Sequence, residues 1–130
     1  MEIITDNSYN KKIINTDTTE PFILMFESKT CPHCKTVKNT LKRIDEDKNK
    51  PCNINIYVIR AEESPKLINQ YAIRSFPTTL FFCKNRSIRH NILGGQSLEA
   101  FVSGYNKVCQ DFNKQKKEKS SFFKSLFGKK

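Results

Sequence analysis

The chain has 130 residues, of which 37% are hydrophobic, and its formal net charge is +10 at pH 7. This length suits one domain that buries a core without disulfides as staples. The apolar content is ordinary, and no run approaches the roughly 18 apolar residues that a spanning helix requires. Neither disorder nor a membrane span is therefore indicated.

The positive charge is concentrated near the C-terminus. Residues 114–130 carry seven lysines and a single acidic residue, Glu118, so they account for +6 of the net charge. Residues 1–113 have a mild excess of +4, which makes this part a poor nucleic-acid binder. We expect a domain over residues 1–113, a basic tail over residues 114–130 and no nucleic-acid partner.

The N-terminal segment bears on the compartment. "MEIITDNSYNKK" has no basic stretch followed by an apolar stretch, which is the pattern of a signal peptide. This predicts a cytoplasmic protein, where cysteines are more often catalytic or metal-binding than structural. A mature exported form with an added Met is the alternative.

The first predicted elements alternate between helix and strand. Residues 1–5 predict a short edge strand, and Asp6 or Asn7 a cap for the helix that follows. A polar loop over residues 16–20 leads to "FILMF" (residues 22–26), a continuous apolar run typical of a strand buried on both faces.

The next segment, "SKTCPHCK" (residues 28–35), places Cys31 and Cys34 around a Pro-His pair. Such a pair can be a zinc half-site, a structural bridge or a working thiol–disulfide centre. Zinc needs two further ligands, and no second pair follows. We therefore expect no metal, and the choice between a redox centre and an inert pair of cysteines stays open at this point. Apolar residues then recur at helical spacing, with a proline in the first turn: Pro32, Cys34, Val37, Leu41 and Ile44.

The second half of the chain predicts three more strands and two helices. Residues 54–59 form a buried strand, and Ser64 caps a short helix that begins at Pro65. Strands over residues 78–83 and 88–93 form an antiparallel hairpin. After a glycine pair, Ser97 caps a long helix with one apolar face: Leu98, Phe101, Val102, Tyr105, Val108 and Phe112. The order β-α-β-α-β-β-α predicts an α/β protein with a mixed sheet flanked by helices.

Residues 1–112 resemble the thioredoxin superfamily in three features. A buried strand runs into a Cys-x-x-Cys motif at a helix start, "YAIRSFPTTLFF" (residues 71–82) follows downstream, and Gly94-Gly95 precedes the last helix. The resemblance implies a thioredoxin-like fold and thiol–disulfide exchange with protein substrates. It implies no cofactor beyond the redox-active Cys31–Cys34 disulfide.

The resemblance also implies a substrate groove at Phe76, Pro77 and Thr78. Pro77 is expected to follow a cis peptide bond and to face the two cysteines, which would turn the backbone of Phe76 outward. Phe76 as an ordinary core residue is the alternative. Arg74 fits a solvated or helix-capping charge better than a substrate ligand.

The chemistry assigns different roles to the two cysteines. Cys31 at a helix N-terminus is the attacking thiolate, because unpaired N–H groups there favour an anion. Cys34 lies one turn further in, where it resolves the mixed disulfide. Pro32 and His33 are expected to tune the thiolate, since His33 can donate a hydrogen bond to it; a solvated His33 is the alternative.

The motif resembles that of disulfide oxidases more than that of reducing thioredoxins. Pro-His is the oxidase dipeptide, Thr30 replaces an expected Trp, and Met25 replaces a buried Asp that is a candidate base for Cys34. The inserted helical domain of the periplasmic oxidases is absent, however. We expect a monomeric oxidoreductase that is more oxidising than ordinary thioredoxin and works with an unidentified redox partner.

Two features fall outside this scheme. Cys52, Cys83 and Cys109 are expected to be single thiols, of which at least one stays unpaired because the total number of cysteines is odd.

Residues 119–130 predict a short basic amphipathic helix that contacts an anionic membrane, with a solvated or self-packing tail as the alternative. A non-enzymatic peptide-binding module, held at a membrane by this tail, is the competing function.

Overall fold

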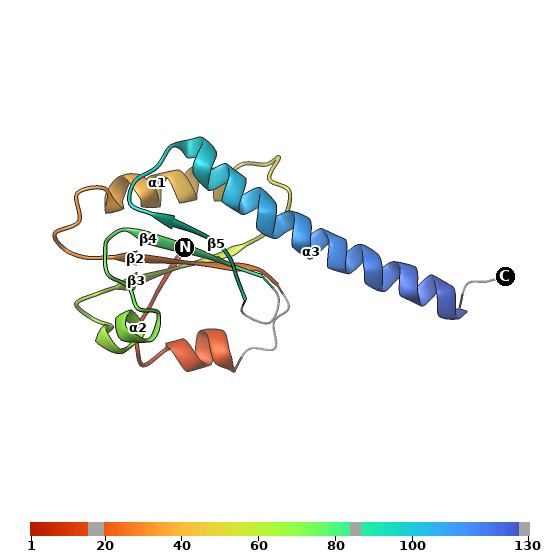
Figure 1. The fold of residues 1–130 in the computed structure, drawn as a ribbon, viewed down its shortest axis with the longest axis horizontal. Helices are drawn as coiled ribbons and strands as arrows, with labels where there is room; N and C mark the ends of the chain where they lie inside the picture. The colour runs from red at the N-terminus through yellow and green to blue at the C-terminus, as the bar shows by residue number, and fades with distance from the viewer. Residues whose placement is uncertain (16–19, 84–86, 128–130) are drawn as a thin grey trace.

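A five-stranded sheet forms the centre of the protein (Figure 1). The computed structural model describes residues 1–15, 20–83 and 87–127, and of residues 114–127 it describes the backbone alone. The strands lie in the order β1-β3-β2-β4-β5, with β1, β3 and β2 parallel and the β4–β5 hairpin antiparallel. Their bounds are Glu2–Ile4 (β1), Phe22–Glu27 (β2), Asn55–Arg60 (β3), Thr78–Phe82 (β4) and Ile88–Leu93 (β5). The predicted mixed sheet is confirmed.

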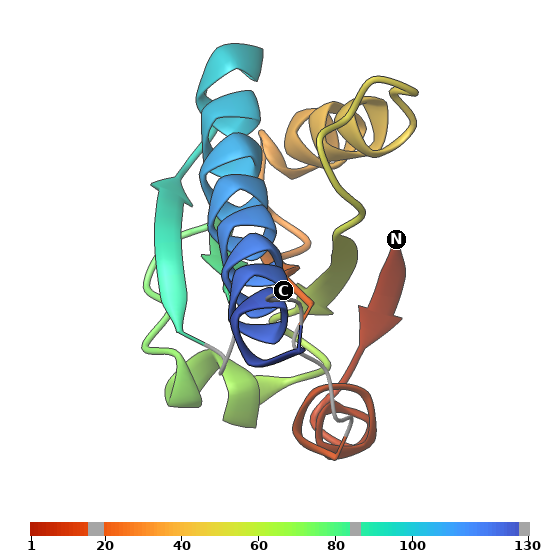
Figure 2. The same ribbon diagram turned by 90° about the vertical axis from the view of Figure 1, so that its right-hand side faces the viewer.

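Helices cover both faces of the sheet (Figures 1 and 2). On one face lie α1 (Cys34–Asp45) and the long α3 (Leu98–Phe127). On the other lie α2 (Pro65–Gln70) and a π-helical turn, η1 (Asn10–Ile14). The predicted element order is therefore confirmed, with β1 and η1 preceding it.

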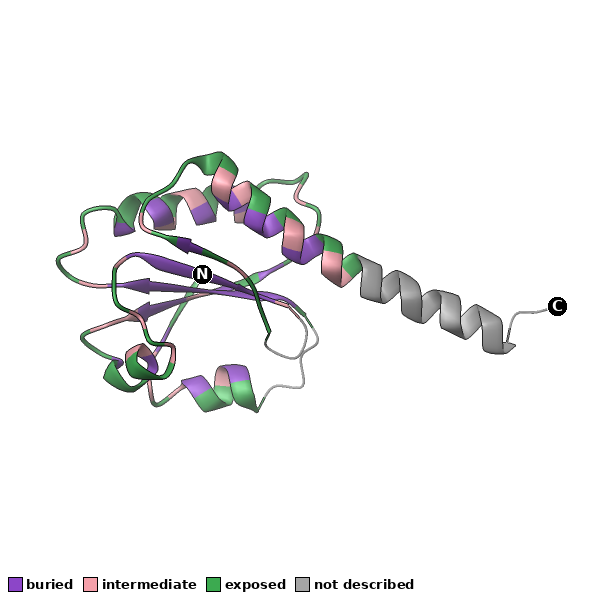
Figure 3. Cartoon of the chain, in the orientation of Figure 1, coloured by how far each residue is buried: buried purple, intermediate pink, exposed green. Residues whose placement is uncertain are grey.

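Strand β2 occupies the middle of the sheet because all its side chains can be buried. Its six residues are all buried, and successive side chains point to opposite faces. Ile23 and Met25 join the core beneath α1 and α3, whereas Phe22, Leu24 and Phe26 join the core beneath α2 (Figure 3). Each such side chain stabilises the fold by about 1.5–3 kcal/mol, so the strand that leads into the cysteine motif is held firmly.

The helix starts differ from the prediction in their caps. Asp6 does not cap η1, which begins without a side-chain cap. Its carboxylate instead accepts the Lys66 and Leu67 N–H groups at the start of α2, at 3.1 and 2.9 Å. Ser64, the predicted cap of α2, is fully buried and its hydroxyl has no hydrogen-bond partner.

Other boundaries lie close to those predicted. α1 begins at Cys34, so Pro32 precedes the first turn by two residues. Ser97 does cap α3, because its hydroxyl accepts the Ala100 N–H at 3.3 Å. The predicted loop over residues 16–20 lies largely outside the described residues.

The prediction of three single thiols outside the motif was wrong. Cys52, in the segment before β3, and Cys109 of α3 form a disulfide with an S–S distance of 2.01 Å. They are 57 residues apart in sequence, and only the packing of α3 against the α1 side of the sheet brings them together. Cys83 is free, as the odd total requires.

Helix α3 extends beyond the sheet (Figure 1). Position 113, the predicted end of the domain, falls inside this helix, and the two-part organisation stays a prediction. Within the described part of the chain, none of the helices has the length and apolarity needed to cross a membrane. Residues 128–130 of the predicted amphipathic segment lie outside the described residues.

Candidate functional site

The two motif cysteines are joined to each other. The S–S distance is 2.09 Å and the Cα atoms are 5.5 Å apart, which is within the usual range for a disulfide. Among the described residues, no group of three or more His, Cys, Asp and Glu side chains is arranged to hold a metal ion. Cys31 and Cys34 therefore form a disulfide of ordinary geometry.

The surroundings of the two sulfurs differ. Cys34 is the first residue of α1 and is 4% exposed, whereas Cys31 lies in the preceding loop and is half-buried. The Cys31 N–H donates to the Ser28 carbonyl at 3.3 Å, and the first helical bond runs from the Val37 N–H to the His33 carbonyl. The pair therefore sits at a helix N-terminus, where an anion is favoured, and an incoming nucleophile has access to Cys31.

The segment around Pro77 lies at the same edge of the sheet. The Phe76–Pro77 bond is cis, as the resemblance implied. Thr78 pairs with Phe26 near the end of β2, so Pro77 stands level with the start of the cysteine loop. Phe76 is half-buried and packs against the same buried cluster as Cys31.

The glycine pair completes this edge. The Gly94 N–H donates to the Pro77 carbonyl at 2.7 Å, and its φ of +76° favours glycine. At Gly95, a Cβ atom would lie 3.1 Å from the Cβ of His33. The structure thus brings together three segments that are far apart in sequence: the cysteine loop, the Pro77 turn and Gly94-Gly95.

The remaining predicted residues occupy different environments. Pro32 and His33 are exposed, and His33 makes no side-chain cap to α1. Thr78 is only 3% exposed and its hydroxyl donates to the Ser75 carbonyl at 2.8 Å, so this side chain shapes the turn. Arg74 is exposed.

The floor beneath Cys34 is apolar. Met25 is fully buried, belongs to the same core cluster as Cys34, and lies between Val58 and Thr79 in the sheet register. None of these three side chains can take up a proton near neutral pH. The Thr79 hydroxyl, also fully buried, has no hydrogen-bond partner.

Cys83 is unsuited to exchange. Burial, followed by a hydrogen bond to the Asp111 carboxylate at 3.4 Å, raises the pKa of its thiol to about 11. Because the thiolate is the reactive species, this thiol is a poor nucleophile at neutral pH.

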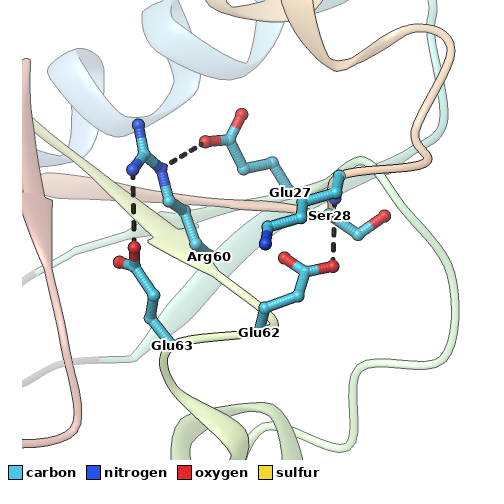
Figure 4. A pocket seen from close by; sticks show the side chains of 6 residues that line it. Glu27, Ser28, Arg60, Glu62 and Glu63 are labelled. Atoms are coloured by element: carbon cyan, nitrogen blue, oxygen red, sulfur yellow. Dashed lines mark hydrogen bonds and ion pairs between the residues drawn. The ribbon is translucent and has the colours of Figure 1, made fainter.

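Sequence reasoning missed an ion-paired carboxylate next to the site. Glu27 ends β2 and is 8% exposed, yet it contacts Arg60 of β3 (Figure 4). It also contacts Lys38 of α1. The available signal was a charged residue that directly follows a five-residue apolar run.

Comparison with known proteins identifies the family. The thioredoxin family model matches residues 1–107. The chain is 27% identical to a thioredoxin of Rickettsia felis, over 80% of this chain and 94% of that protein. It is 28% identical to chloroplastic thioredoxin M-type of Pisum sativum, over 72% of this chain and 52% of that protein.

A longer relative and a solved structure extend this picture. Identity to protein disulfide isomerase-like 2-1 of Oryza sativa is 23% over 82% of this chain, which spans 29% of that protein. The crystal structure of Malassezia sympodialis thioredoxin superposes with a TM-score of 0.69 at 17% identity, over 84% of this chain and 90% of that one, and so shows the fold. The chain belongs to the thioredoxin family, and it is a thiol–disulfide oxidoreductase.

Proposed function

We propose that the protein exchanges disulfides with protein substrates through Cys31 and Cys34, and that its disulfide is more oxidising than that of ordinary thioredoxin. The observation that carries this proposal is the asymmetric disulfide itself. Cys31 is accessible at the start of α1, whereas Cys34 is buried beneath it.

The oxidation of a substrate dithiol takes two steps. A substrate thiolate attacks the Cys31 sulfur, the Cys31–Cys34 bond breaks, and Cys34 leaves as a thiolate. A second thiolate of the same substrate then attacks the substrate sulfur that is bonded to Cys31, and Cys31 leaves as a thiolate. The substrate dithiol loses two electrons and two protons and becomes a disulfide, and the Cys31–Cys34 pair gains both electrons and both protons and becomes a dithiol. An external disulfide or quinone oxidant, the unidentified redox partner, regenerates the pair.

Three observations favour the oxidising direction. His33 is exposed between the two cysteines and can stabilise the Cys31 thiolate, which stabilises the reduced form. Met25 leaves no buried carboxylate at its position to deprotonate Cys34 during substrate reduction. The Cys52–Cys109 disulfide counts against the cytoplasmic location that the N-terminus predicts, because such bonds persist mainly in oxidising compartments.

The substrate would lie along the edge formed by Cys31, the Pro77 turn and the glycine pair. Phe76 is half-exposed there and can contact a substrate backbone, while Pro77 and Thr78 hold the turn in place. In this scheme the chain acts as a monomer, and no cofactor other than the disulfide takes part.

Equilibration with glutathione buffers tests the oxidising direction. The reduced fractions of the two disulfides are measured separately, by alkylation followed by peptide mass spectrometry. We expect the Cys31–Cys34 potential to lie above the value of about −270 mV typical of thioredoxin; a value at or below it contradicts the proposal.

Trapping of mixed disulfides tests the exchange with protein substrates. A Cys34→Ser variant should trap mixed disulfides with proteins, and a Cys31→Ser control should trap none.

The projecting end of α3 favours a second, additional role in membrane attachment. The backbone continues as one helix to Phe127, beyond the sheet (Figure 1). Helical spacing places the apolar residues 122, 123, 126 and 127 on one face, and the surrounding sequence is rich in lysine. We propose that this segment, residues 119–130, binds the surface of an anionic membrane.

Vesicle sedimentation tests the attachment. The full chain should sediment with phosphatidylglycerol vesicles but not with phosphatidylcholine vesicles, and the 1–113 form should sediment with neither. Equal behaviour of the two forms on anionic vesicles excludes this role. Unchanged insulin reduction by the 1–113 form would show that its fold is intact.

A further inference from the structure

An ionic cluster lies next to the active-site disulfide, at the ends of two central strands. β2 and β3 carry one charged residue each, Glu27 and Arg60, and these stand opposite each other in the sheet register. The Glu27 side chain is 10% exposed. Its carboxylate forms ion pairs with Lys38 Nζ at 2.9 Å and with Arg60 Nε at 3.2 Å. Two cations therefore pair this carboxylate, which offsets the cost of burying it.

The cluster belongs to the same packed interface as the Cys34 sulfur. Lys38 follows Cys34 by four residues in α1, so the two side chains are neighbours on one face of the helix. Met25 precedes Glu27 by two residues in β2, so both side chains point to that helix, and Met25 packs in the cluster that holds Cys34. Glu27 and Lys38 therefore continue the contact between β2 and α1 that begins at Cys34 and Met25.

Acidic residues after β3 bind both the cluster and the cysteine loop. Arg60 also contacts Glu63, at 3.5 Å, and the Lys29 N–H donates to the Glu62 carboxylate at 3.0 Å (Figure 4). A cavity of about 200 Å³ opens between these groups and admits solvent to the Glu27 carboxylate. The hydrogen bond to Glu27 raises the pKa of Arg60, a side chain that is charged at neutral pH in any case.

We propose that Glu27 is a positioning residue that sets the reduction potential of the Cys31–Cys34 pair by neutralising Lys38 and holding it beside Cys34. An unneutralised cation at this place would stabilise the thiolates of the reduced pair by Coulomb attraction, because Lys38 lies one helical turn after Cys34 in α1. Glu27 thus keeps the pair less oxidising than His33 and the helix N-terminus alone would make it. The inference rests on the redox activity of the pair, and not on whether its potential exceeds that of thioredoxin.

The test compares two variants that change charge with little change in shape. Glu27→Gln should shift the equilibrium with glutathione toward the dithiol by about threefold, which equals about 14 mV at 29.6 mV per tenfold change. The pH midpoint of Cys31 alkylation should fall with it. Lys38→Met removes the cation and keeps most of its stem, so both quantities should move in the opposite direction.

Glu63→Gln is the matched control. It makes the same charge change on an exposed residue that contacts Arg60 but not Lys38, and we expect a potential equal to that of the unsubstituted chain. Equal potentials in Glu27→Gln and Glu63→Gln would overturn the proposal. So would a shift of the same sign in Glu27→Gln and Lys38→Met, which indicates lost packing rather than charge. If Glu27→Gln fails to fold, the sign of the Lys38→Met shift decides the question, and an unchanged or more oxidising Lys38→Met overturns the proposal.

Discussion

At the scale of single residues, the properties of the site depend on the side chains that surround Cys34. Met25 and Thr79 make the floor under Cys34 apolar or neutral, and Glu27 places a carboxylate two residues further along β2. A proton released or taken up by Cys34 must therefore pass through solvent or through groups at the rim. The chemistry of the pair is set by neighbours that a motif search for Cys-x-x-Cys does not register.

Ala72 adopts a left-handed backbone conformation that lowers the stability of the fold. It follows α2 with φ of +53°, a conformation that glycine adopts without strain but that costs other residues about 1–2 kcal/mol. Replacing Ala72 with Gly removes this cost and adds about 0.5–1 kcal/mol of unfolded-chain entropy. We expect Ala72→Gly to raise the free energy of unfolding by about 0.5–1 kcal/mol, measured in urea.

Ala100→Gly is the control for this prediction. Ala100 lies in the first turn of α3, in ordinary helical conformation, so the same chemical change should lower stability there by up to about 1 kcal/mol. Loss of stability in both variants would show that the positive φ of Ala72 is not a strained position.

At the scale of elements, the start of α2 is stabilised by a residue from another part of the chain. Asp6 caps this helix across some 60 residues of sequence, and the Ser64 hydroxyl is buried without a partner. These hydrogen bonds join the N-terminal β1–η1 segment to α2, on the face of the sheet opposite α1 and α3. A prediction from local sequence assigns this role to Ser64, because it considers only residues next to the helix start and Asp6 lies some 60 residues earlier.

Two alanine variants distinguish the caps. Asp6→Ala should lower the free energy of unfolding by about 1 kcal/mol, the usual cost of losing an N-cap. Ser64→Ala should leave stability unchanged or raise it, since it removes an unsatisfied buried hydroxyl. Urea unfolding measures both, and a larger loss in Ser64→Ala than in Asp6→Ala would contradict the assignment.

At the scale of the whole molecule, the Cys52–Cys109 disulfide fastens α3 to the body of the protein. The Tyr105 hydroxyl donates to the Cys52 carbonyl at 3.1 Å and supports the same junction. The bond lies shortly before the part of α3 that leaves the sheet. It therefore holds α3 to the body of the protein at Cys109, before the part of the helix that extends beyond the sheet.

Removal of this disulfide should have a large effect on stability. A bridge across 57 residues stabilises by about 4 kcal/mol in the chain-entropy estimate. The double variant Cys52→Ala/Cys109→Ala should lose roughly that amount in urea unfolding under oxidising conditions. Cys83→Ala, which removes a free thiol, should lose far less; similar losses in the two variants would argue against a stabilising bridge.

The sequence by itself determined the element order and the place of the cysteine pair at a helix start. These follow from local signals: a run of five apolar residues, apolar residues at helical spacing and the Cys-x-x-Cys motif. The Ser97 cap was predictable for the same reason, because a capping hydroxyl and its N–H partner lie three residues apart. The redox role of the pair and the importance of the Pro77 segment came from the resemblance to the thioredoxin superfamily.

Only the tertiary structure decided which distant residues meet. It paired Cys52 with Cys109, moved the cap of α2 from Ser64 to Asp6, and placed Glu27 between Lys38 and Arg60. Each contact joins elements that are not neighbours in sequence. Side-chain periodicity indicates which face of an element is buried, but the partner across the interface depends on the packing of the whole sheet.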